Sequence, residues 1–166
     1  MLCFNLFRIP TKNLVHVVVD TNVFISDLTR VKEMLNGDNG GLIVFIPWSV
    51  TRELDKLKTT GDDTPELAAR ARQAINFVHD QLLNRNQKVP TSTYTSRRHN
   101  NVCSLQIRGQ TGAEEKSAEV YRAYNADDRI LQACLKLKSE DRKVVLYTND
   151  KNLANKSMMS NVTACW

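Results

Sequence analysis

The chain has 166 residues, of which 42% are hydrophobic and 25% charged, and its formal net charge is +5. This length suffices for one domain with a core that needs no disulfides, and the composition excludes a disordered or fibrous chain. No apolar run approaches the roughly 20 residues of a membrane-spanning helix, and the first ten residues lack the apolar region of a signal peptide. We therefore expect an intracellular protein with no membrane partner. The positive charge favours polyanions through phosphate contacts, although it also serves solubility alone.

The four cysteines, Cys3, Cys103, Cys134 and Cys165, are spread along the chain and form no Cys-x-x-Cys pair. The three histidines likewise have no zinc-ligand spacing. We expect buried thiols rather than a zinc site.

Short apolar strands alternate with helices in the first part of the chain. The β-branched run Leu14–Val19 is typical of a strand buried on both faces of a parallel sheet, and Leu42–Ile46 predicts a second one. Between them a helix is predicted through Val31 and Leu35, followed by turn residues at 36–41.

Two helices are predicted after the second strand. Ser49 is expected to cap a helix that runs to about Lys58. Pro65 suits the first turn of a longer helix that reaches about Asn84.

The segment 85–112 loses periodicity, apart from a short strand predicted at Val102–Ile107. Helices are predicted from about Ala113 and after Asn125, then a buried strand at Lys143–Tyr147, a last short helix and a last strand. The alternation predicts a single domain over 1–166. Its expected fold is a three-layer α/β/α sandwich around a mostly parallel sheet, with 85–112 as a flexible or inserted segment.

Two predicted strands end at an aspartate: Asp20 follows the first and Asp150 follows Lys143–Tyr147. Parallel strands share a direction, so both side chains are expected at the edge of the sheet where α/β proteins bind ligands. The alternative is that each aspartate only caps a helix or turn.

Two more acidic positions lie on predicted helices. Glu53 follows Val50 by three residues and borders the apolar stripe, so it needs a partner or a metal unless it simply reaches solvent. Asp127 and Asp128 precede an apolar helix, and one of them can cap it. Because one cap does not need two adjacent acids, we predict Asp128 as a metal ligand, with Asp127 as the alternative.

Converging carboxylates need a cation, because two of them about 4 Å apart repel by roughly 4 kcal/mol at an effective dielectric near 20. Oxygen ligands without His or Cys suit Mg²⁺ or Mn²⁺ rather than zinc. Such ions activate water and neutralise phosphate charge. Together with the net positive charge, the acids predict a metal-dependent enzyme that cuts a nucleic-acid backbone.

The chain resembles a PIN domain over nearly its whole length. The resemblance is carried by 17–25 (VVVDTNVFI), 46–47 (IP), 52–55 (RELD), 125–131 (NADDRIL) and 144–153 (VVLYTNDKNL). The four of these motifs that carry an acid are specific in this order, although none is decisive alone. The chain is similar to eukaryotic members in RNA surveillance, the endonucleases of nonsense-mediated decay and nuclear mRNA quality control.

The resemblance implies an endoribonuclease that hydrolyses single-stranded RNA with Mg²⁺ or Mn²⁺. The family's metal-binding catalytic acids match Asp20, Glu53, Asp128 and Asp150. It further implies action in the nucleus rather than the cytoplasm, with other RNA-processing proteins or a second copy of the chain as partners.

Five further residues are expected to bind substrate. Thr21, Asn22 and Thr148 would position the acids or contact phosphate, with local turn hydrogen bonding as the alternative. Arg97 and Arg98 would add phosphate contacts from a basic flap at 85–112, with a solvated loop as the alternative.

Two other functions are weighed against this one. The first is a PIN-like RNA-binding or protein-interaction module with weak or no catalysis, against which all four acids count. The second is a phosphotransfer enzyme with Asp20 as nucleophile. Haloacid-dehalogenase-like phosphatases carry a second Asp two residues later, where this chain has Asn22.

Overall fold

Five parallel strands form one sheet in the order β3-β2-β1-β4-β5. The computed structural model of the chain describes residues 14–36, 41–59, 64–87 and 106–166. The strands are β1 (Val15–Val19), β2 (Leu42–Ile46), β3 (Gln106–Gly109), β4 (Lys143–Tyr147) and β5 (Thr163–Cys165). The central strand β1 pairs with β2 on one side and β4 on the other.

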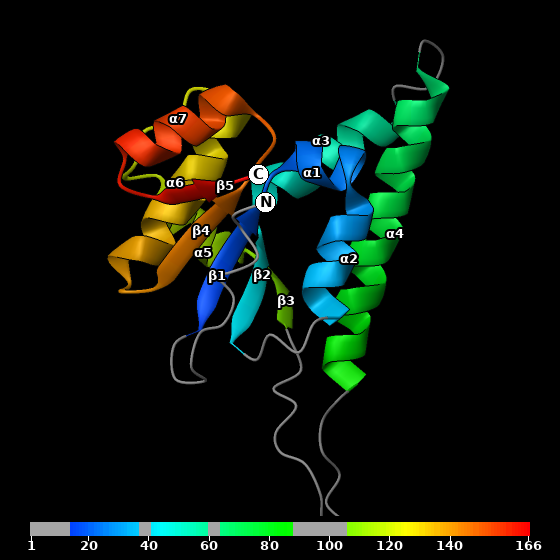
Figure 1. Ribbon diagram of the computed structural model, residues 1–166, viewed down its shortest axis with the longest axis horizontal. Coiled ribbons are helices and arrows are strands. Elements are labelled where there is room, and N and C mark those ends of the chain that lie inside the picture. The colour runs from blue at the N-terminus through cyan, green and yellow to red at the C-terminus, as the bar shows by residue number, and fades with distance from the viewer. Residues whose placement is uncertain (1–13, 37–40, 60–63, 88–105) are drawn as a thin grey trace, which may run out of the picture.

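Helices cover both faces of the sheet, which confirms the predicted three-layer α/β/α architecture (Figure 1). One face carries α1 (Thr21–Ser26), α2 (Leu28–Asn36), α3 (Trp48–Thr59) and α4 (Pro65–Gln87), and the other carries α5 (Gly112–Ala118), α6 (Ala126–Ser139) and α7 (Lys151–Met159). The chain moves outward from β1 to β3, then crosses back to β4, so the helices change faces as right-handed crossovers require.

The core lies between the sheet and these helices. Every residue of β1 and β2 is buried, which explains why both strands are continuous apolar runs rather than alternating ones. Helix side chains such as Phe24, Leu54 and Ile130 complete the packing. The prediction of buried thiols holds for Cys134 and Cys165; Cys3 and Cys103 lie outside the described residues.

Two predictions about the helices are wrong in detail. The helix expected after β1 is broken at Asp27, because the Asp27 carboxylate accepts a hydrogen bond from the Arg30 N–H and thereby starts α2 as a separate helix. Ser49 does not cap α3, which begins one residue earlier; the Trp48 N–H is satisfied instead by Gln110 Oε1 at 3.0 Å.

The segment 85–112 is described only in part. Helix α4 continues to Gln87, past the predicted end near Asn84, and the short predicted strand is found at Gln106–Gly109 rather than Val102–Ile107. Residues 88–105 lie outside the described part of the chain. Within that part, no helix is long and apolar enough to cross a membrane.

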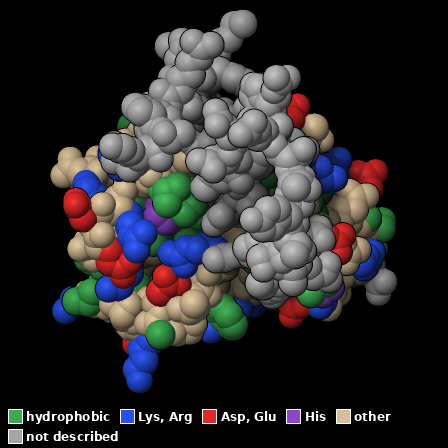
Figure 2. Space-filling model, turned by 90° about the horizontal axis from the view of Figure 1, so that it is seen from below, with side chains coloured by type: hydrophobic (Ala, Val, Ile, Leu, Met, Phe, Trp, Pro, Cys, Tyr) green, Lys and Arg blue, Asp and Glu red, His purple; other side chains and the backbone are tan. Residues whose placement is uncertain are grey.

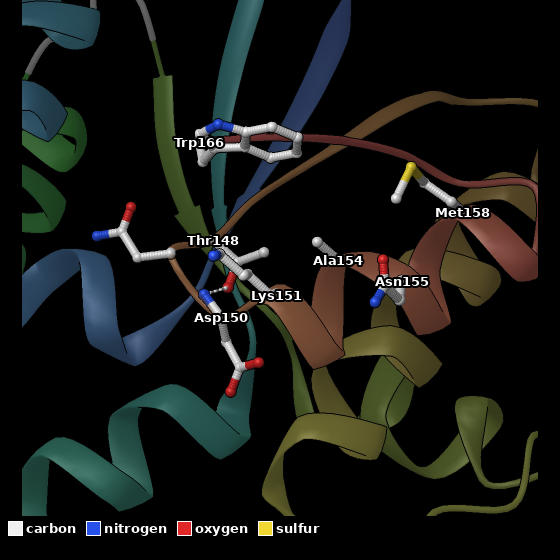
Figure 3. A pocket seen from close by; sticks show the side chains of 8 residues that line it. Thr148, Asp150, Lys151, Ala154, Asn155, Met158 and Trp166 are labelled. Carbon is white, nitrogen blue, oxygen red and sulfur yellow. Dashed lines mark hydrogen bonds between the residues drawn. The ribbon is translucent and has the colours of Figure 1, made fainter.

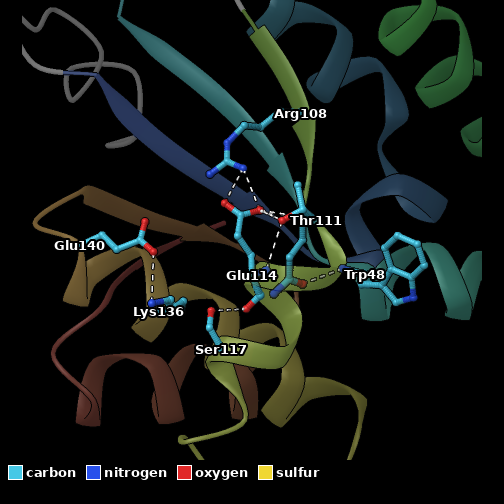
Figure 4. Close-up of polar contacts among 8 residues, drawn as sticks. Trp48, Arg108, Thr111, Glu114, Ser117, Lys136 and Glu140 are labelled. Carbon is cyan, nitrogen blue, oxygen red and sulfur yellow. Dashed lines mark hydrogen bonds and ion pairs between the residues drawn. The ribbon is translucent and has the colours of Figure 1, made fainter.

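Hydrogen bonds and an ion pair among Arg108, Thr111 and Glu114 hold the link from β3 to α5 (Figure 4). Arg108 donates to Glu114 Oε1 at 2.9 Å, and Thr111 and Glu114 cap each other's backbone in a capping box. Burial alone would raise the pKa of Glu114, but hydrogen bonds from the Thr111 N–H and from Arg108 lower it below its usual value. This carboxylate is fully supplied with partners.

Candidate active site

The sheet order places Asp20 and Asp150 at the carboxyl ends of neighbouring strands, as the sequence predicts. Val19 of β1 is level with Tyr147 of β4, and the Asp20 N–H donates to the Tyr147 carbonyl at 3.0 Å. Strand β1 is also where the order of the strands reverses, so the acids lie at the switch point at which open α/β sheets bind ligands.

Asp20 is buried, with 1% of its surface exposed, although it directly precedes α1. Its side chain makes no capping hydrogen bond to that helix. Instead, Asp20 Oδ2 accepts a hydrogen bond from Thr148 Oγ1 at 2.8 Å. The alternative of a simple helix cap is therefore excluded for Asp20.

The charge on Asp20 is incompletely compensated. Burial raises the pKa of Asp20, and the negative charges of Asp127 and Glu53 raise it further, while the hydrogen bond from Thr148 partly offsets these effects. The net result is a raised pKa. A buried acid surrounded by like charges is a typical feature of a functional site.

Glu53 is half-buried on α3, beside the buried Leu54, as its position next to the apolar stripe predicts. The hydroxyl of Thr21 donates to Glu53 Oε2 at 2.6 Å. Since Thr21 follows Asp20 directly, this bond ties α3 to the end of β1 and fixes the carboxylate of Glu53 near Asp20.

Asp150 has a divided role. Its Oδ1 accepts hydrogen bonds from the N–H groups of Asn152 at 2.6 Å and Leu153 at 3.1 Å, so it caps α7. Its own N–H donates to Thr148 Oγ1 at 3.0 Å. The capping alternative is thus correct for one oxygen of Asp150. Thr148 joins Asp20 to Asp150.

The cap of α6 is Asn125, whose Oδ1 accepts from the Asp128 N–H at 2.8 Å. Asp128 pairs with Lys156, with Oδ1 and Nζ 2.7 Å apart, and its Oδ2 accepts from the Tyr124 N–H. The hydrogen bond from Lys156 lowers the pKa of Asp128. Asp128, which the sequence analysis predicts as a metal ligand, is therefore engaged in an ion pair with Lys156.

Asp127 is the acid that couples to the rest of the cluster. Burial raises its pKa, and the charges of Asp150 and Glu53 raise it further, while the charge of Lys156 only partly offsets these effects. Asp127 also raises the pKa of Asp20. We call Asp20, Glu53, Asp127 and Asp150 the acid cluster.

Sequence reasoning missed Lys156. Hydrogen bonding to Asp128 raises the pKa of Lys156, and the charges of Asp128, Asp127 and Asp150 add to this effect. The only signal in the sequence is that Lys156 follows the buried Leu153 by three residues on α7. Which acids it meets depends on how α7 packs against α6.

Of the other predicted substrate-binding residues, Asn22 is exposed beside Thr21 on α1. Arg97 and Arg98 lie outside the described residues. Thr21 and Thr148 both make hydrogen bonds to acids, which is one of the two roles expected of them.

A divalent ion needs several oxygen ligands close together. Among the described residues, no three Asp, Glu, His or Cys side chains are close enough to form a ready-made metal site. Mg²⁺ usually keeps several waters and binds through one or two carboxylates together with substrate phosphates. Because the donors here are carboxylate oxygens, and burial and neighbouring acids raise the pKa of Asp20 and Asp127, the acid cluster fits a hydrated Mg²⁺ or Mn²⁺ rather than a caged ion.

Comparison with known families decides the classification. A family model described as a PIN domain matches residues 17–165. The chain belongs to the PIN domain family. This confirms the resemblance found in the sequence.

Three curated relatives extend this result. The PIN domain is 29% identical over 153 residues to the human "Transcriptional protein SWT1" and 32% identical over 149 residues to that of Schizosaccharomyces pombe. It is 30% identical over 173 residues to the zebrafish (Danio rerio) "Telomerase-binding protein EST1A". These matches cover 88%, 87% and 89% of the chain but only 15%, 27% and 10% of the respective relatives.

A solved structure shows the same fold. A domain of a functionally unknown protein from Methanocaldococcus jannaschii superposes with a TM-score of 0.53 at 16% identity, covering 91% of this chain and 89% of that one. The PIN domain fold is therefore shared well beyond recognisable sequence similarity.

Proposed function

We propose that this PIN domain is an endoribonuclease that hydrolyses phosphodiester bonds of single-stranded RNA with Mg²⁺ or Mn²⁺. The observation that carries the proposal is Asp20: its side chain makes no capping hydrogen bond to α1, and burial, together with the charges of Asp127 and Glu53, raises its pKa. Such an arrangement destabilises the fold unless a cation or a function offsets it.

The four members of the acid cluster would hold the ion, with Asp127 in place of Asp128. Asp127 is favoured because its charge couples to Asp20, Asp150 and Glu53, whereas Asp128 is neutralised by Lys156. When bound, the ion lowers the pKa of a water and offsets charge on the phosphate. In the hydrolysis, the water oxygen would form a bond to phosphorus as the bond from phosphorus to the leaving oxygen breaks. The attacking water would lose a proton to solvent and the leaving oxygen would take one up, which gives a phosphate monoester and an alcohol.

The threonines fix the geometry for this step. Thr148 donates to Asp20 and accepts from the Asp150 N–H, so one hydroxyl sets the separation of two acids from adjacent strands. Thr21 orients Glu53 in the same way. Lys156 keeps Asp128 ionised and brings a positive charge to the rim of the acid cluster, where it can contact a phosphate.

The face opposite the acid cluster carries charges of both signs (Figure 2). Figure 2 views the molecule from below Figure 1, away from the acid cluster. On the described part of that face, Lys and Arg side chains lie among Asp and Glu side chains rather than in one continuous basic patch.

The biological setting is proposed from relatives. The resemblance to RNA-surveillance endonucleases, together with relatives named as a transcriptional and a telomerase-binding protein, supports a nuclear role in RNA quality control. Other RNA-processing proteins or a second copy of the chain would be its partners there. The flap proposed around Arg97 and Arg98 would add phosphate contacts.

The test is cleavage of end-labelled single- and double-stranded RNA with Mn²⁺, Mg²⁺ or a chelator. We expect cleavage of the single strand only with metal, and a loss of at least about a hundredfold in Asp20→Asn, since even residues that merely orient ligands cost about 10- to 100-fold. Asp27→Asn is the matched control, because Asp27 is exposed and Asn caps α2 equally well.

A measurement without turnover complements the assay. Mn²⁺ should raise the melting temperature of the wild type but not of Asp20→Asn. Cleavage by Asp20→Asn at the wild-type rate would overturn the proposal. RNA binding without any cleavage would instead establish the binding-module alternative, which is favoured by the lack of a ready-made three-ligand site within the described part of the chain.

A further inference from the structure

A pocket of about 360 Å³ lies directly beside the acid cluster, at the carboxyl ends of β4 and β5. Trp166, Met158 and Ala154 form its apolar side, and Asn155 and Lys151 supply an amide and an ammonium group (Figure 3). Asn149 lines the pocket as well. Its volume lies within the range of about 300–1,000 Å³ that is usual for small-molecule sites. We call it the Trp166 pocket.

The Trp166 pocket and the acid cluster share Asp150 and are joined by Thr148. Thr148 and Asp150 line the pocket, and Thr148 Oγ1 lies 2.8 Å from Asp20 Oδ2. In Figure 3 the carboxylate of Asp150 points away from Trp166, so Asp150 separates the apolar pocket from the acids. A phosphate at the acid cluster would therefore place the rest of its nucleotide at the mouth of the pocket.

The exposure of the apolar side chains calls for an explanation. Trp166 is 70% exposed and Met158 is 49% exposed, and both belong to one concave surface. A flat aromatic side chain beside a phosphate-binding edge is the usual platform for a nucleobase, because every base has a π-face. The sulfur of a methionine also packs well against aromatic rings.

The polar groups of the pocket fit a neutral, hydrogen-bonding ligand. Asn149 Nδ2 donates to Ser26 Oγ at 2.9 Å, which anchors that side chain to the end of α1. The side chain of Asn155 makes no hydrogen bond to the described residues, and its amide offers both a donor and acceptor. Lys151 and Asp150 also line the pocket, and their opposite charges offset each other. The apolar side formed by Trp166, Met158 and Ala154 then favours a base over a second phosphate.

We propose that the Trp166 pocket binds the base of the nucleotide next to the cleaved phosphodiester, with Trp166 stacked on the base and Asn155 hydrogen-bonded to its edge. The inference rests on the proposed ribonuclease function and adds a substrate subsite to it. Stacking tolerates all four bases, and one amide can both donate and accept. The subsite therefore selects unpaired over paired nucleotides rather than one base over another.

The chain allows a direct optical test, because it contains only two tryptophans. In the Trp48→Phe protein all tryptophan emission comes from Trp166. With metal chelated, we expect a seven-nucleotide oligoadenylate to quench this emission, while inorganic polyphosphate of equal charge does not. Equal quenching by both, or none by the oligonucleotide, would overturn the proposal.

Affinity measurements of the variants provide the second arm. Trp166→Ala should weaken binding of the oligoadenylate by about tenfold, the loss expected for one stacked base, and Trp166→Phe should restore most of it. Met158→Ala should weaken binding a few-fold, whereas Met159→Ala should not. Met159 is the matched control, since it is the next residue on α7, is 86% exposed and does not line the pocket.

These results separate the subsite from the proposed function. Metal-dependent cleavage with an unquenched Trp166 and an unchanged affinity in Trp166→Ala would remove the subsite and leave the ribonuclease standing. Quenching by the oligonucleotide without cleavage at any metal concentration would support the subsite and remove the enzyme. If Trp166→Ala lowered both the affinity and the melting temperature, the result would count against the subsite, unless Trp166→Phe restored both.

Discussion

Glu114 and Asp20 are two carboxylates that follow strands of the same sheet, yet their surroundings are opposite. Glu114 has a guanidinium at 2.9 Å and the N–H and hydroxyl of Thr111, and its pKa is lowered. Among the described residues, Asp20 has only the hydroxyl of Thr148 and the N–H of Thr21 as donors, and burial together with two acidic neighbours raises its pKa. An acid with a full set of donors stabilises the fold. A buried acid among like charges destabilises it, and such acids are typical of functional sites.

The largest expected effect tests which acids, besides Asp20, belong to the site that binds the ion. Asp127→Asn should lower the rate of RNA cleavage by about a hundredfold or more, like Asp20→Asn, because both acids are proposed to bind the ion. Asp128→Asn should cost no more than about tenfold, since it disturbs only the pairing with Lys156. Single-turnover cleavage rates of the two variants decide the assignment. The reverse order would restore Asp128 as the ligand.

An intermediate effect is expected for Thr148, which orients the acids but carries no charge. Thr148→Val removes the hydrogen bonds to Asp20 Oδ2 and from the Asp150 N–H while keeping nearly the same volume. The rate should fall by about 10- to 100-fold. Thr148→Ser should recover most of it, because the hydroxyl is retained. An unchanged rate in Thr148→Val would show that the acids need no such support.

The smallest effects are those on the stability of the metal-free protein, and they should have opposite signs. Glu114→Gln should lower the free energy of unfolding by about 1 kcal/mol at neutral pH. Because the folded protein lowers the pKa of Glu114, its stabilising contribution is present above the unfolded pKa and is lost as the pH falls through the folded one. The difference between variant and wild type should therefore shrink in acid.

Asp20→Asn should instead stabilise the metal-free protein at neutral pH. The raised pKa of Asp20 means that the wild type gains relative stability as the pH falls through the folded pKa, so the advantage of the variant exists above that pKa and fades below it. Urea unfolding of both variants in chelator, at neutral and acid pH, measures the signs. A destabilised Asp20→Asn at neutral pH would contradict the contrast with Glu114.

Much of the fold follows from the sequence, because β1, β2 and β4 are apolar runs long enough to be recognised alone. The break at Asp27 was not predicted, since the apolar positions on both sides of it fit one continuous helix. Ser49 was assigned as a cap because serine favours that position, but a distant side chain, Gln110, satisfies the start of α3. Local propensity cannot reveal a partner that the tertiary fold supplies.

The candidate site divides in the same way. Asp20 and Asp150 could be placed together because parallel strands share an edge. The choice between Asp127 and Asp128 could not be made, because it depends on the turn of α6 that the Asn125 cap fixes and on the position of Lys156. A one-residue difference on a helix turns a side chain by about 100°.

The two oxygens of Asp150 have a consequence for any mutational study of this protein. Since Oδ1 holds the first turn of α7, an alanine at this position would loosen the helix that bears Lys156 and Met158 as well as delete a charge. Asparagine preserves the cap and removes only the charge. The difference between the two variants would report how far the acid cluster relies on an anchored α7.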